Sequence, residues 1–339
     1  MSRLTKPDLK NEILLRIQKN FPLEAQPFKV IAKELNTTST EVLTLLNEAK
    51  DEKIIRQTSA IFDTKKLGYS SSLVAFEIAE EQIDEAVKIL NAHPGISHNY
   101  ERNHTFNIWF TLAVAPNSKL GLEKTVEILA LKTKAINYIV LPTLKLFKIS
   151  VKLDTTNTQS QKEHVKTKVY NELTLNDFHY ELIKHLQKDI SFVEEPFKEI
   201  IEALNISYET LFEHIQEFLD AGVIRRYASI LNHRNAGFNA NAMVVWNINE
   251  ENALEIGKEA ASYSAVSHCY LRPKYPNWQY NLFTMIHGKT KEETQKVIDD
   301  IAQNIEHTSY MPLYSSREFK KVRISYFNEA FYEWEQKYI

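Results

Sequence analysis

The chain contains the same sequence pattern twice, and this repeat limits the folds that it can adopt. KNFPLEAQPFKVIAKELN at residues 19–36 matches KDISFVEEPFKEIIEALN at residues 188–205. Further along, SH at 97–98 matches SH at 267–268. A repeat that covers most of the sequence indicates two homologous halves, each of about 150 residues, which is a usual domain size.

Composition excludes several classes of site. The chain has 339 residues, of which 43% are hydrophobic and 25% charged, as in soluble globular proteins. It has only 7 glycines, and none are spaced as in a dinucleotide fingerprint or a P-loop. The single cysteine, Cys269, excludes an intramolecular disulfide and sites in which several cysteines hold zinc or an iron–sulfur cluster.

Charge and hydropathy limit the expected partners and cellular location of the protein. The formal net charge of −3 provides no basic field that would attract nucleic acid or an anionic membrane. No run of about 18 apolar residues exists, and the N-terminus lacks the apolar core of a signal peptide. We therefore expect a cytoplasmic protein that does not associate with membranes.

Each half begins with a pattern typical of a winged helix-turn-helix domain. In the first half, apolar residues at helical spacing fill residues 8–18, 27–35 and 39–49, and a β-rich tract starts at Ile54. Proline at position 27 suits the first turn of the second helix. Three short helices followed by a hairpin are therefore expected.

The rest of each half predicts a ferredoxin-like domain, because its elements follow in the order β-α-β-β-α-β. In the first half, strands are expected at 71–78, 96–102, 106–114 and 137–152, with helices at 80–92 and 119–132. In the second half, strands are expected at 241–248, 266–272, 280–287 and 307–325, with helices at 250–263 and 290–303.

The predicted fold is α+β. It is a tandem repeat of a winged helix-turn-helix domain and a ferredoxin-like domain, and its two halves form an intramolecular pseudo-dimer. This layout resembles the leucine-responsive (Lrp/AsnC) regulators. The predicted boundaries are 1–62 and 169–231 for the winged helix-turn-helix domains, 63–153 and 232–327 for the ferredoxin-like domains, 154–168 for a polar linker, and 328–339 for a C-terminal helix.

The helix of the second half that would contact DNA lacks the chemistry for it. Residues 199–224 contain no Lys or Arg, whereas the regulators need such side chains for phosphates and bases. We therefore expect no DNA binding, and we interpret the helical domains as a retained scaffold. The carboxylates in this segment are Glu199, Glu202, Glu209, Glu213, Glu217 and Asp220.

The densest polar and aromatic cluster lies on the middle hairpin of each ferredoxin-like domain. Alternate residues of a strand share a face, so His98, Tyr100 and Arg102 point the same way. The same residue types recur at positions 268, 270 and 272. Arginine suits carboxylate or phosphate partners, and histidine suits proton delivery near neutral pH. A structural network between sheets, or an exposed edge, is the alternative interpretation.

Further basic and aromatic residues accompany this cluster. Arginines end each helical domain, Phe-Lys pairs repeat on the last strands, and the second half has an insertion, RPKYPNWQ, that would form a rigid aromatic lid. Surface charge at a domain junction, and a cap on the edge of the core, are the alternatives. Together these residues suit a flat, apolar ligand that carries several carboxylates.

Three segments make a second resemblance specific. SHNYERNHTFNIWFTL (97–112), SHCYLRPKYPNWQYNLFTMIHG (267–288) and VIRRYASILNHRNAGFNANAMVVW (223–246) resemble signatures of the sirohaem decarboxylases. The resemblance covers essentially the whole chain, and each half matches one subunit type of a heterodimeric enzyme. It implies loss of CO2 from the acetate side chains at C12 and C18 of sirohaem, giving 12,18-didecarboxysirohaem. The pathway would be either haem d1 synthesis or the alternative haem pathway. A fusion of both subunits in a single chain is more typical of the haem d1 branch. The first half departs from the family pattern, because it lacks the Pro-Trp loop and the Met-Ile-His-Gly ending.

The resemblance also implies roles for individual residues. Sirohaem or a related iron tetrapyrrole would be bound as substrate, and no separate cofactor would be required because the macrocycle can delocalise a carbanion. His98 or His268 could instead ligate the iron. The candidates for proton transfer are His98, His104, His268 and His287. The candidates for substrate binding are Arg56, Tyr100, Arg102, Lys148, Arg225, Arg226, Tyr270, Arg272, Trp278, Tyr280 and Lys320.

Two other functions remain compatible with the sequence. One is a transcription regulator with a small-molecule effector, and the other is a haem-binding sensor without catalysis. Association with a second copy of the chain, or with a partner decarboxylase chain, also stays open.

Overall fold

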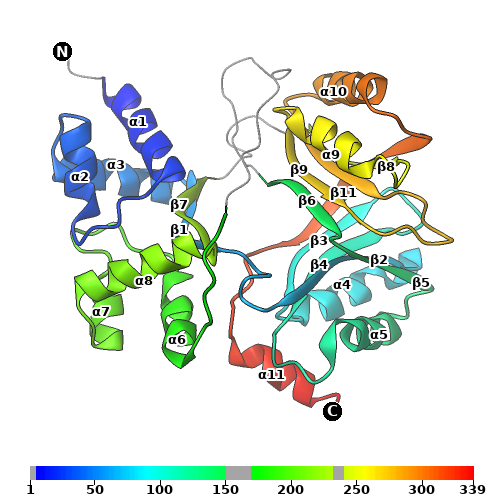
Figure 1. The fold of residues 1–339 in the computed structure, drawn as a ribbon, viewed down its shortest axis with the longest axis horizontal. Coiled ribbons are helices and arrows are strands. Elements are labelled where there is room, and N and C mark those ends of the chain that lie inside the picture. Colours follow the sequence, from blue (N-terminus) through cyan, green and yellow to red (C-terminus); the bar gives the residue numbers. More distant parts are fainter. Residues whose placement is uncertain (1–4, 150–168, 232–239) are drawn as a thin grey trace. The chain divides into compact units, whose positions relative to one another are not determined.

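The computed structural model describes residues 5–149, 169–231 and 240–339, so the predicted linker 154–168 lies outside the described residues. The chain divides into two compact units, and each contains segments of both halves of the repeat (Figure 1). The helical unit comprises Met1–Tyr69, Val169–Asn235 and Ser325–Asn328. The sheet unit comprises Ser70–Lys168, Ala236–Ile324 and Glu329–Ile339.

Each half contributes three helices to the helical unit, as predicted. Local sequence sets their starts: the Thr38 hydroxyl accepts the main-chain N–H of Glu41 at 3.2 Å and caps α3, and Pro27 opens α2. The helices are α1 (Lys6–Lys19), α2 (Pro27–Glu34) and α3 (Ser39–Asp51) in the first half, and α6 (Asp177–Leu186), α7 (Lys198–Leu204) and α8 (Tyr208–Asp220) in the second.

The prediction of a wing hairpin within the first half is wrong. Strand β1 (Ile55–Phe62) instead pairs antiparallel with β7 (Ile224–Leu231) of the second half. The buried hydroxyls of Thr58 and Ser229 lie 2.6 Å apart in this two-stranded sheet. Equivalent strands of the two halves therefore satisfy each other's main-chain hydrogen bonds.

The sheet unit confirms the β-α-β-β-α-β order in both halves. Within each half the strands are ordered fourth, first, third, second, as in a ferredoxin-like sheet. The first half contains β2 (Ser70–Glu77), η1 (Glu80–Gln82), α4 (Ile83–Ala92), β3 (Ile96–Arg102), β4 (Ile108–Val114), α5 (Gly121–Thr133), β5 (Asn137–Pro142) and β6 (Lys145–Ile149). The second half contains β8 (Ala240–Asn247), α9 (Ala253–Ser262), β9 (Val266–Leu271), β10 (Leu282–Gly288), α10 (Lys291–Asn304) and β11 (Ser309–Lys321).

The last strand of each half joins the two sheets. Strand β11 pairs with β8 through Ser309–Tyr314 and then with β3 of the first half through Ser315–Lys321. In return, β6 pairs with β9 of the second half. The order of the described strands is β5-β2-β4-β3-β11-β8-β10-β9-β6, so strands of both halves form one nine-stranded sheet with β5 and β6 at its edges. This exchange is the predicted intramolecular pseudo-dimer.

One hydrophobic cluster fills the face of the joined sheet that the helices leave uncovered. It contains residues of both halves, among them Trp109, Leu141, Phe283 and Leu313. The helices α4 and α5 pack on β2, β3 and β4, and α9 and α10 pack on β8, β9 and β10 (Figure 1). The candidate residues on β3 and β9 therefore border a core that both halves share.

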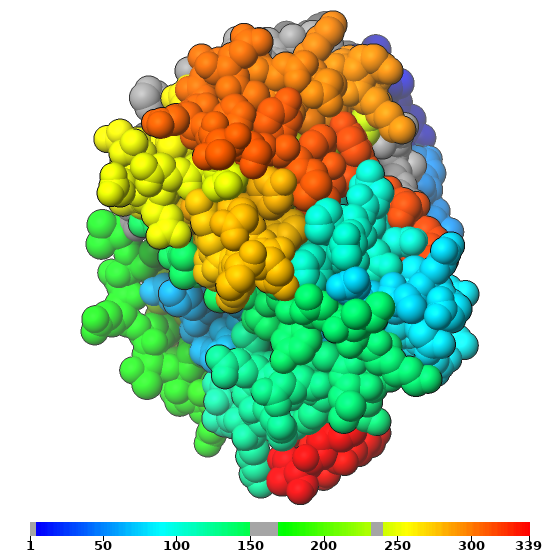
Figure 2. All heavy atoms as spheres, turned by 90° about the vertical axis from the view of Figure 1, so that its right-hand side faces the viewer, coloured from blue at the N-terminus to red at the C-terminus, as the bar shows by residue number. Residues whose placement is uncertain are grey.

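The predicted C-terminal helix forms as α11 (Glu329–Gln336). The Glu335 carboxylate accepts hydrogen bonds from the Ser118 hydroxyl and, at 2.9 Å, from the main-chain N–H of Leu120. Figure 2 shows this red helix against the segment that leads into α5. No helix in the described part of the chain is long and apolar enough to cross a membrane.

Candidate functional site

A β-bulge places a serine beside a histidine in each half. In β3, Ile96 pairs with Leu112 and His98 with Thr111, so Ser97 is the extra residue. Strand β9 has the same irregularity at Ser267. Because a bulge redirects side chains, each serine reaches the next residue: the Oγ–Nδ1 distance is 2.9 Å from Ser97 to His98 and 2.7 Å from Ser267 to the following histidine.

The predicted triplets lie in rows on one face of their strands. The His98 and Tyr100 rings are stacked at 6.2 Å, and the Arg102 guanidinium lies 5.6 Å from the Tyr100 ring centroid. In the second half, the His268 and Tyr270 rings are stacked at 6.1 Å. The guanidinium of Arg272 lies 4.8 Å from the centroid of the second tyrosine and 5.3 Å from that of Phe283.

Both arginines are buried, and the described residues provide no carboxylate for either. Arg102 donates from Nη1 to the Leu313 carbonyl oxygen at 2.6 Å, and Arg272 donates from Nη1 to the Leu141 carbonyl oxygen. Each Nε is buried without a hydrogen-bond partner in the described part of the chain. Burial lowers the pKa of each guanidinium to about 10. Buried charges are normally paired, so both arginines remain candidates for binding an anion.

The site of the second half extends further than that of the first. Ser267 Oγ also lies 2.6 Å from His287 Nε2, and His287 Nδ1 lies 2.8 Å from Asn241 Oδ1. In the first half, the second partner of Ser97 Oγ is Thr111 Oγ1, at 2.7 Å. Both halves therefore have the serine and the first histidine, but the second hydrogen-bond partner of the serine differs between them.

The two predicted lysines bind helix ends. Lys148 is buried and donates to the carbonyl oxygen of Tyr263, the C-cap of α9, at 2.8 Å. Lys320 donates to the carbonyl oxygens of Asn91 and His93, the C-cap of α4, at 2.7 and 3.2 Å. A cation is favourable at a helix C-terminus. Each ammonium therefore fastens the last strand of one half to a helix of the other, and we assign both lysines a structural role.

The insertion after β9 buries its tryptophan against the first half. Trp278 is 2% exposed, and its ring lies 5.5 Å from His104 and 5.3 Å from Trp109 of the first half. The Tyr275 hydroxyl donates to the Val140 carbonyl oxygen of β5 at 2.6 Å, and Figure 2 shows golden atoms of the second half bordering green atoms of the first. Tyr280 packs on the Trp278 ring at 5.2 Å.

His104 is a candidate that the structure separates from the triplets' row. Its Nδ1 accepts the main-chain N–H of Phe106 at 2.9 Å, and its ring stacks on the Phe106 ring. Burial lowers the pKa of His104. This histidine therefore supports the turn between β3 and β4.

The three remaining candidate arginines belong to the helical unit. Arg225 forms an ion pair with Asp63, with Nη2–Oδ2 at 2.8 Å. Arg56 is exposed on β1, and partial burial lowers the pKa of Arg226. All three lie on the paired strands β1 and β7.

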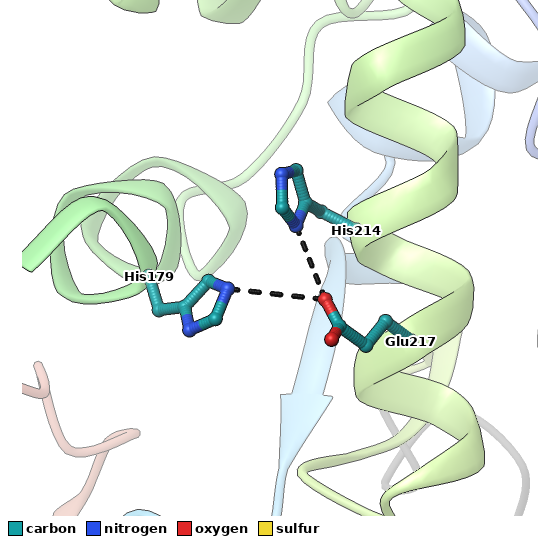
Figure 3. Close-up of side chains that lie close together, drawn as sticks. All are labelled: His179, His214 and Glu217. Carbon is teal, nitrogen blue, oxygen red and sulfur yellow. Dashed lines mark hydrogen bonds and ion pairs between the residues drawn. The ribbon is translucent and has the colours of Figure 1, made fainter. Parts of the chain in front are cut away.

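Among residues 5–149, 169–231 and 240–339, one group has the spacing of metal ligands (Figure 3). Glu217 Oε2 lies 3.2 Å from His214 Nδ1 and 3.8 Å from His179 Nε2. However, His179 Nδ1 accepts the main-chain N–H of Asn176 in the capping box of α6, so the neutral ring carries its hydrogen on Nε2. That nitrogen has no lone pair for a metal, and the group is a polar cluster that joins α6 to α8.

Sequence reasoning missed the hydroxyl and amide partners of the histidines. These are Ser97 and Thr111 in the first half, and Ser267 and Asn241 in the second. The repeated Ser-His dipeptide was the available signal. Strict strand alternation places its two residues on opposite faces, and only the bulge brings them together.

Two domain families match the chain. An AsnC-like ligand binding domain matches residues 66–148 and 235–320, and a "Siroheme decarboxylase NirDL-like HTH domain" matches residues 10–56 and 180–225. Both match twice, in agreement with the repeat.

Known proteins are similar over the same range. "Siroheme decarboxylase" of Hydrogenobacter thermophilus is 40% identical over 324 residues, covering 96% of both chains. The "Siroheme decarboxylase beta subunit" of Methanosarcina barkeri is 40% identical over 143 residues, which are 42% of this chain and 94% of that subunit. The crystal structure of the siroheme decarboxylase NirDL with an iron-uroporphyrin III analogue is 34% identical, covers 98% of both chains and has a TM-score of 0.78.

Proposed function

Because this chain belongs to the sirohaem decarboxylases, we propose that it removes CO2 from the acetate side chains at C12 and C18 of sirohaem. The product would be 12,18-didecarboxysirohaem, an intermediate of haem d1 or alternative haem synthesis. Two homologous sites on one chain match a substrate that loses two equivalent groups.

The observation that carries this proposal is the pair of buried arginines. Arg102 and Arg272 are 5% and 8% exposed, and each has a buried Nε without a partner in the described residues. Sirohaem carries carboxylates around its ring, and a charge-assisted hydrogen bond from such a group would satisfy the unused donor. The tyrosine rings beside the arginines would contact the apolar part of the substrate.

The reaction requires an electron sink and a proton. When the bond to the carboxylate carbon breaks, CO2 leaves and the electron pair stays on the remaining carbon. The macrocycle of the substrate can delocalise this charge, so we propose no separate cofactor. A histidine then protonates the carbon to give a methyl group.

We assign the two proton transfers to His98 and His268. The Nδ1 atom of each faces a serine hydroxyl, which fixes the ring and assigns the transfer to Nε2. Coordination of the sirohaem iron by one of these histidines is the competing assignment for the same atom. Both roles place the histidine against the substrate.

Anaerobic incubation of the protein with sirohaem, followed by mass analysis of the tetrapyrrole, tests the function. We expect loss of two CO2 per sirohaem with the native protein and none with heat-denatured protein. Bound but unaltered sirohaem would contradict the decarboxylase and support a sensor.

A further inference from the structure

We propose that the proton for the second-half reaction comes from His287 and reaches His268 through the hydroxyl of Ser267. This inference rests on the proposed decarboxylation and adds the route of the proton. His287 does not touch the substrate in this scheme and acts as a positioning and proton-supplying residue.

The hydroxyl of Ser267 bridges two imidazole rings. Its Oγ lies 2.7 Å from His268 Nδ1 and 2.6 Å from His287 Nε2. A hydroxyl can accept one hydrogen bond while it donates another. Both distances are short enough for a proton to pass along the chain.

Asn241 determines which nitrogen of His287 exchanges the proton. Asn241 and His287 are directly opposite each other on β8 and β10, and Asn241 Oδ1 lies 2.8 Å from His287 Nδ1. An amide oxygen only accepts hydrogen bonds, so Nδ1 keeps its hydrogen whether the ring is neutral or charged. The proton is therefore gained and lost at Nε2, the atom that faces Ser267.

The transfer balances as three coupled moves. His268 gives the hydrogen on Nε2 to the substrate carbanion, Ser267 gives its hydroxyl hydrogen to His268 Nδ1, and the His287 imidazolium gives the hydrogen on Nε2 to Ser267 Oγ. One N–H bond of His287 is lost and one C–H bond of the product is formed. The product state is a neutral His287 that still donates through Nδ1 to Asn241.

The first half has no histidine equivalent to His287 that could supply a proton. Because Thr111 pairs with His98 as Met285 pairs with His268, the position of His287 corresponds to Ala113. The hydroxyl of Thr111 stands behind Ser97 instead, and a neutral hydroxyl is not a proton source near neutral pH. The two halves therefore obtain their protons by different routes.

The test is a single-turnover assay of wild type and His287→Gln with sirohaem. Glutamine can still form hydrogen bonds to Ser267 and Asn241 but cannot hold an imidazolium proton. We expect one of the two CO2 losses to slow by ~10-fold or more, below the ~100- to 10,000-fold of a direct donor. The KM for sirohaem should stay within about twofold, and a product that has lost one CO2 should accumulate.

A proton inventory in H2O–D2O mixtures separates a relay from a structural effect. For the affected step, the rate should depend on deuterium fraction with curvature in wild type, because several protons move, and linearly in His287→Gln. Ser267→Ala should reproduce this change, whereas Ser267→Thr, which keeps the hydroxyl, should restore the curvature. His307→Gln, a histidine of the same unit outside the site, should behave as wild type.

Three results would overturn the inference. If wild type releases no CO2, the proposed function itself fails, and the relay fails with it. If wild type releases two CO2 and His287→Gln keeps the same rates and curvature, the relay alone fails. Should His287→Gln not fold, equal rates and curvature in Ser267→Ala and Ser267→Thr would refute the relay.

Discussion

The Arg102 guanidinium donates a hydrogen bond from Nη1 to the carbonyl oxygen of Leu313, at 2.6 Å, across the boundary between the two halves. The second half has the equivalent contact, because Arg272 donates to the carbonyl oxygen of Leu141. Each arginine is therefore held by a strand of the other half, β11 or β5. Two halves on one chain keep both arginines in place, which explains why neither site is complete within a single half.

Replacing Arg272 with Ala should weaken the binding of sirohaem. Removal of a hydrogen bond to a charged group costs ~1.5–3 kcal/mol, or about 10- to 150-fold in Kd. Spectral titration of sirohaem measures this change. Arg317→Ala removes an exposed arginine paired with Glu101 and should leave the Kd unchanged. An unaltered Kd in Arg272→Ala would remove this arginine from the site.

Replacing Lys148 with Met should lower stability without weakening sirohaem binding. The change leaves the Tyr263 carbonyl at the end of α9 without its donor, which costs about 1–3 kcal/mol of unfolding free energy. Denaturant unfolding measures it, and Lys88→Met, at an exposed lysine, is the control. A weaker Kd with unchanged stability would restore the substrate-binding role that the sequence suggested.

Acid should destabilise the chain through His93. This side chain is fully buried, and burial lowers its pKa to about 3, while Lys320 acts in the same direction. The unfolded chain binds the proton more readily, so stability is complete above about pH 6.5 and falls as the pH decreases towards 3, by at most ~1.4 kcal/mol per pH unit. His93→Asn keeps an acceptor for the Gly95 N–H and should lose less stability between pH 6.5 and 4.5. Equal slopes for the two proteins would contradict this cause.

Generic duplex DNA should give no retarded band at about 150 mM salt. Helix α8 presents carboxylates where a recognition helix needs cations, and phosphate would repel it. A gel-shift assay with protein in excess measures this. Tight binding that weakens steeply with added salt would refute the scaffold interpretation.

Local sequence patterns predicted most helices and strands to within a few residues, but the strand expected at 137–152 forms as two, β5 and β6. Period-two alternation placed β3 and its row of His98, Tyr100 and Arg102, and helical periodicity with caps such as Thr38 placed the helices. The repeat supplied the pseudo-dimer, because two equal copies must cover each other's open sheet faces. These features depend on residues that are close together in the sequence, so they can be predicted from the sequence alone.

Contacts between distant segments were not predictable in the same way. The pairing of β1 with β7, the capping of α9 by Lys148 and the burial of Trp278 against His104 all depend on how the halves meet. A lysine in a Phe-Lys pair resembles a surface or ligand-binding cation until its carbonyl partner is known. The bulges at Ser97 and Ser267 likewise break the alternation from which the site was inferred.

The CO2 released per sirohaem by wild type, His98→Ala, His268→Ala and the double variant tests the central claim most directly. Two paired sites predict two CO2 for wild type, one for each single variant and none for the double variant. Each affected step should slow by ~100-fold or more, the contribution of a positioned proton donor. If one histidine instead ligates the iron, its variant should show a shifted Soret band before any loss of turnover. Release of two CO2 by the double variant, with unchanged spectra, would contradict both roles and the two-site account.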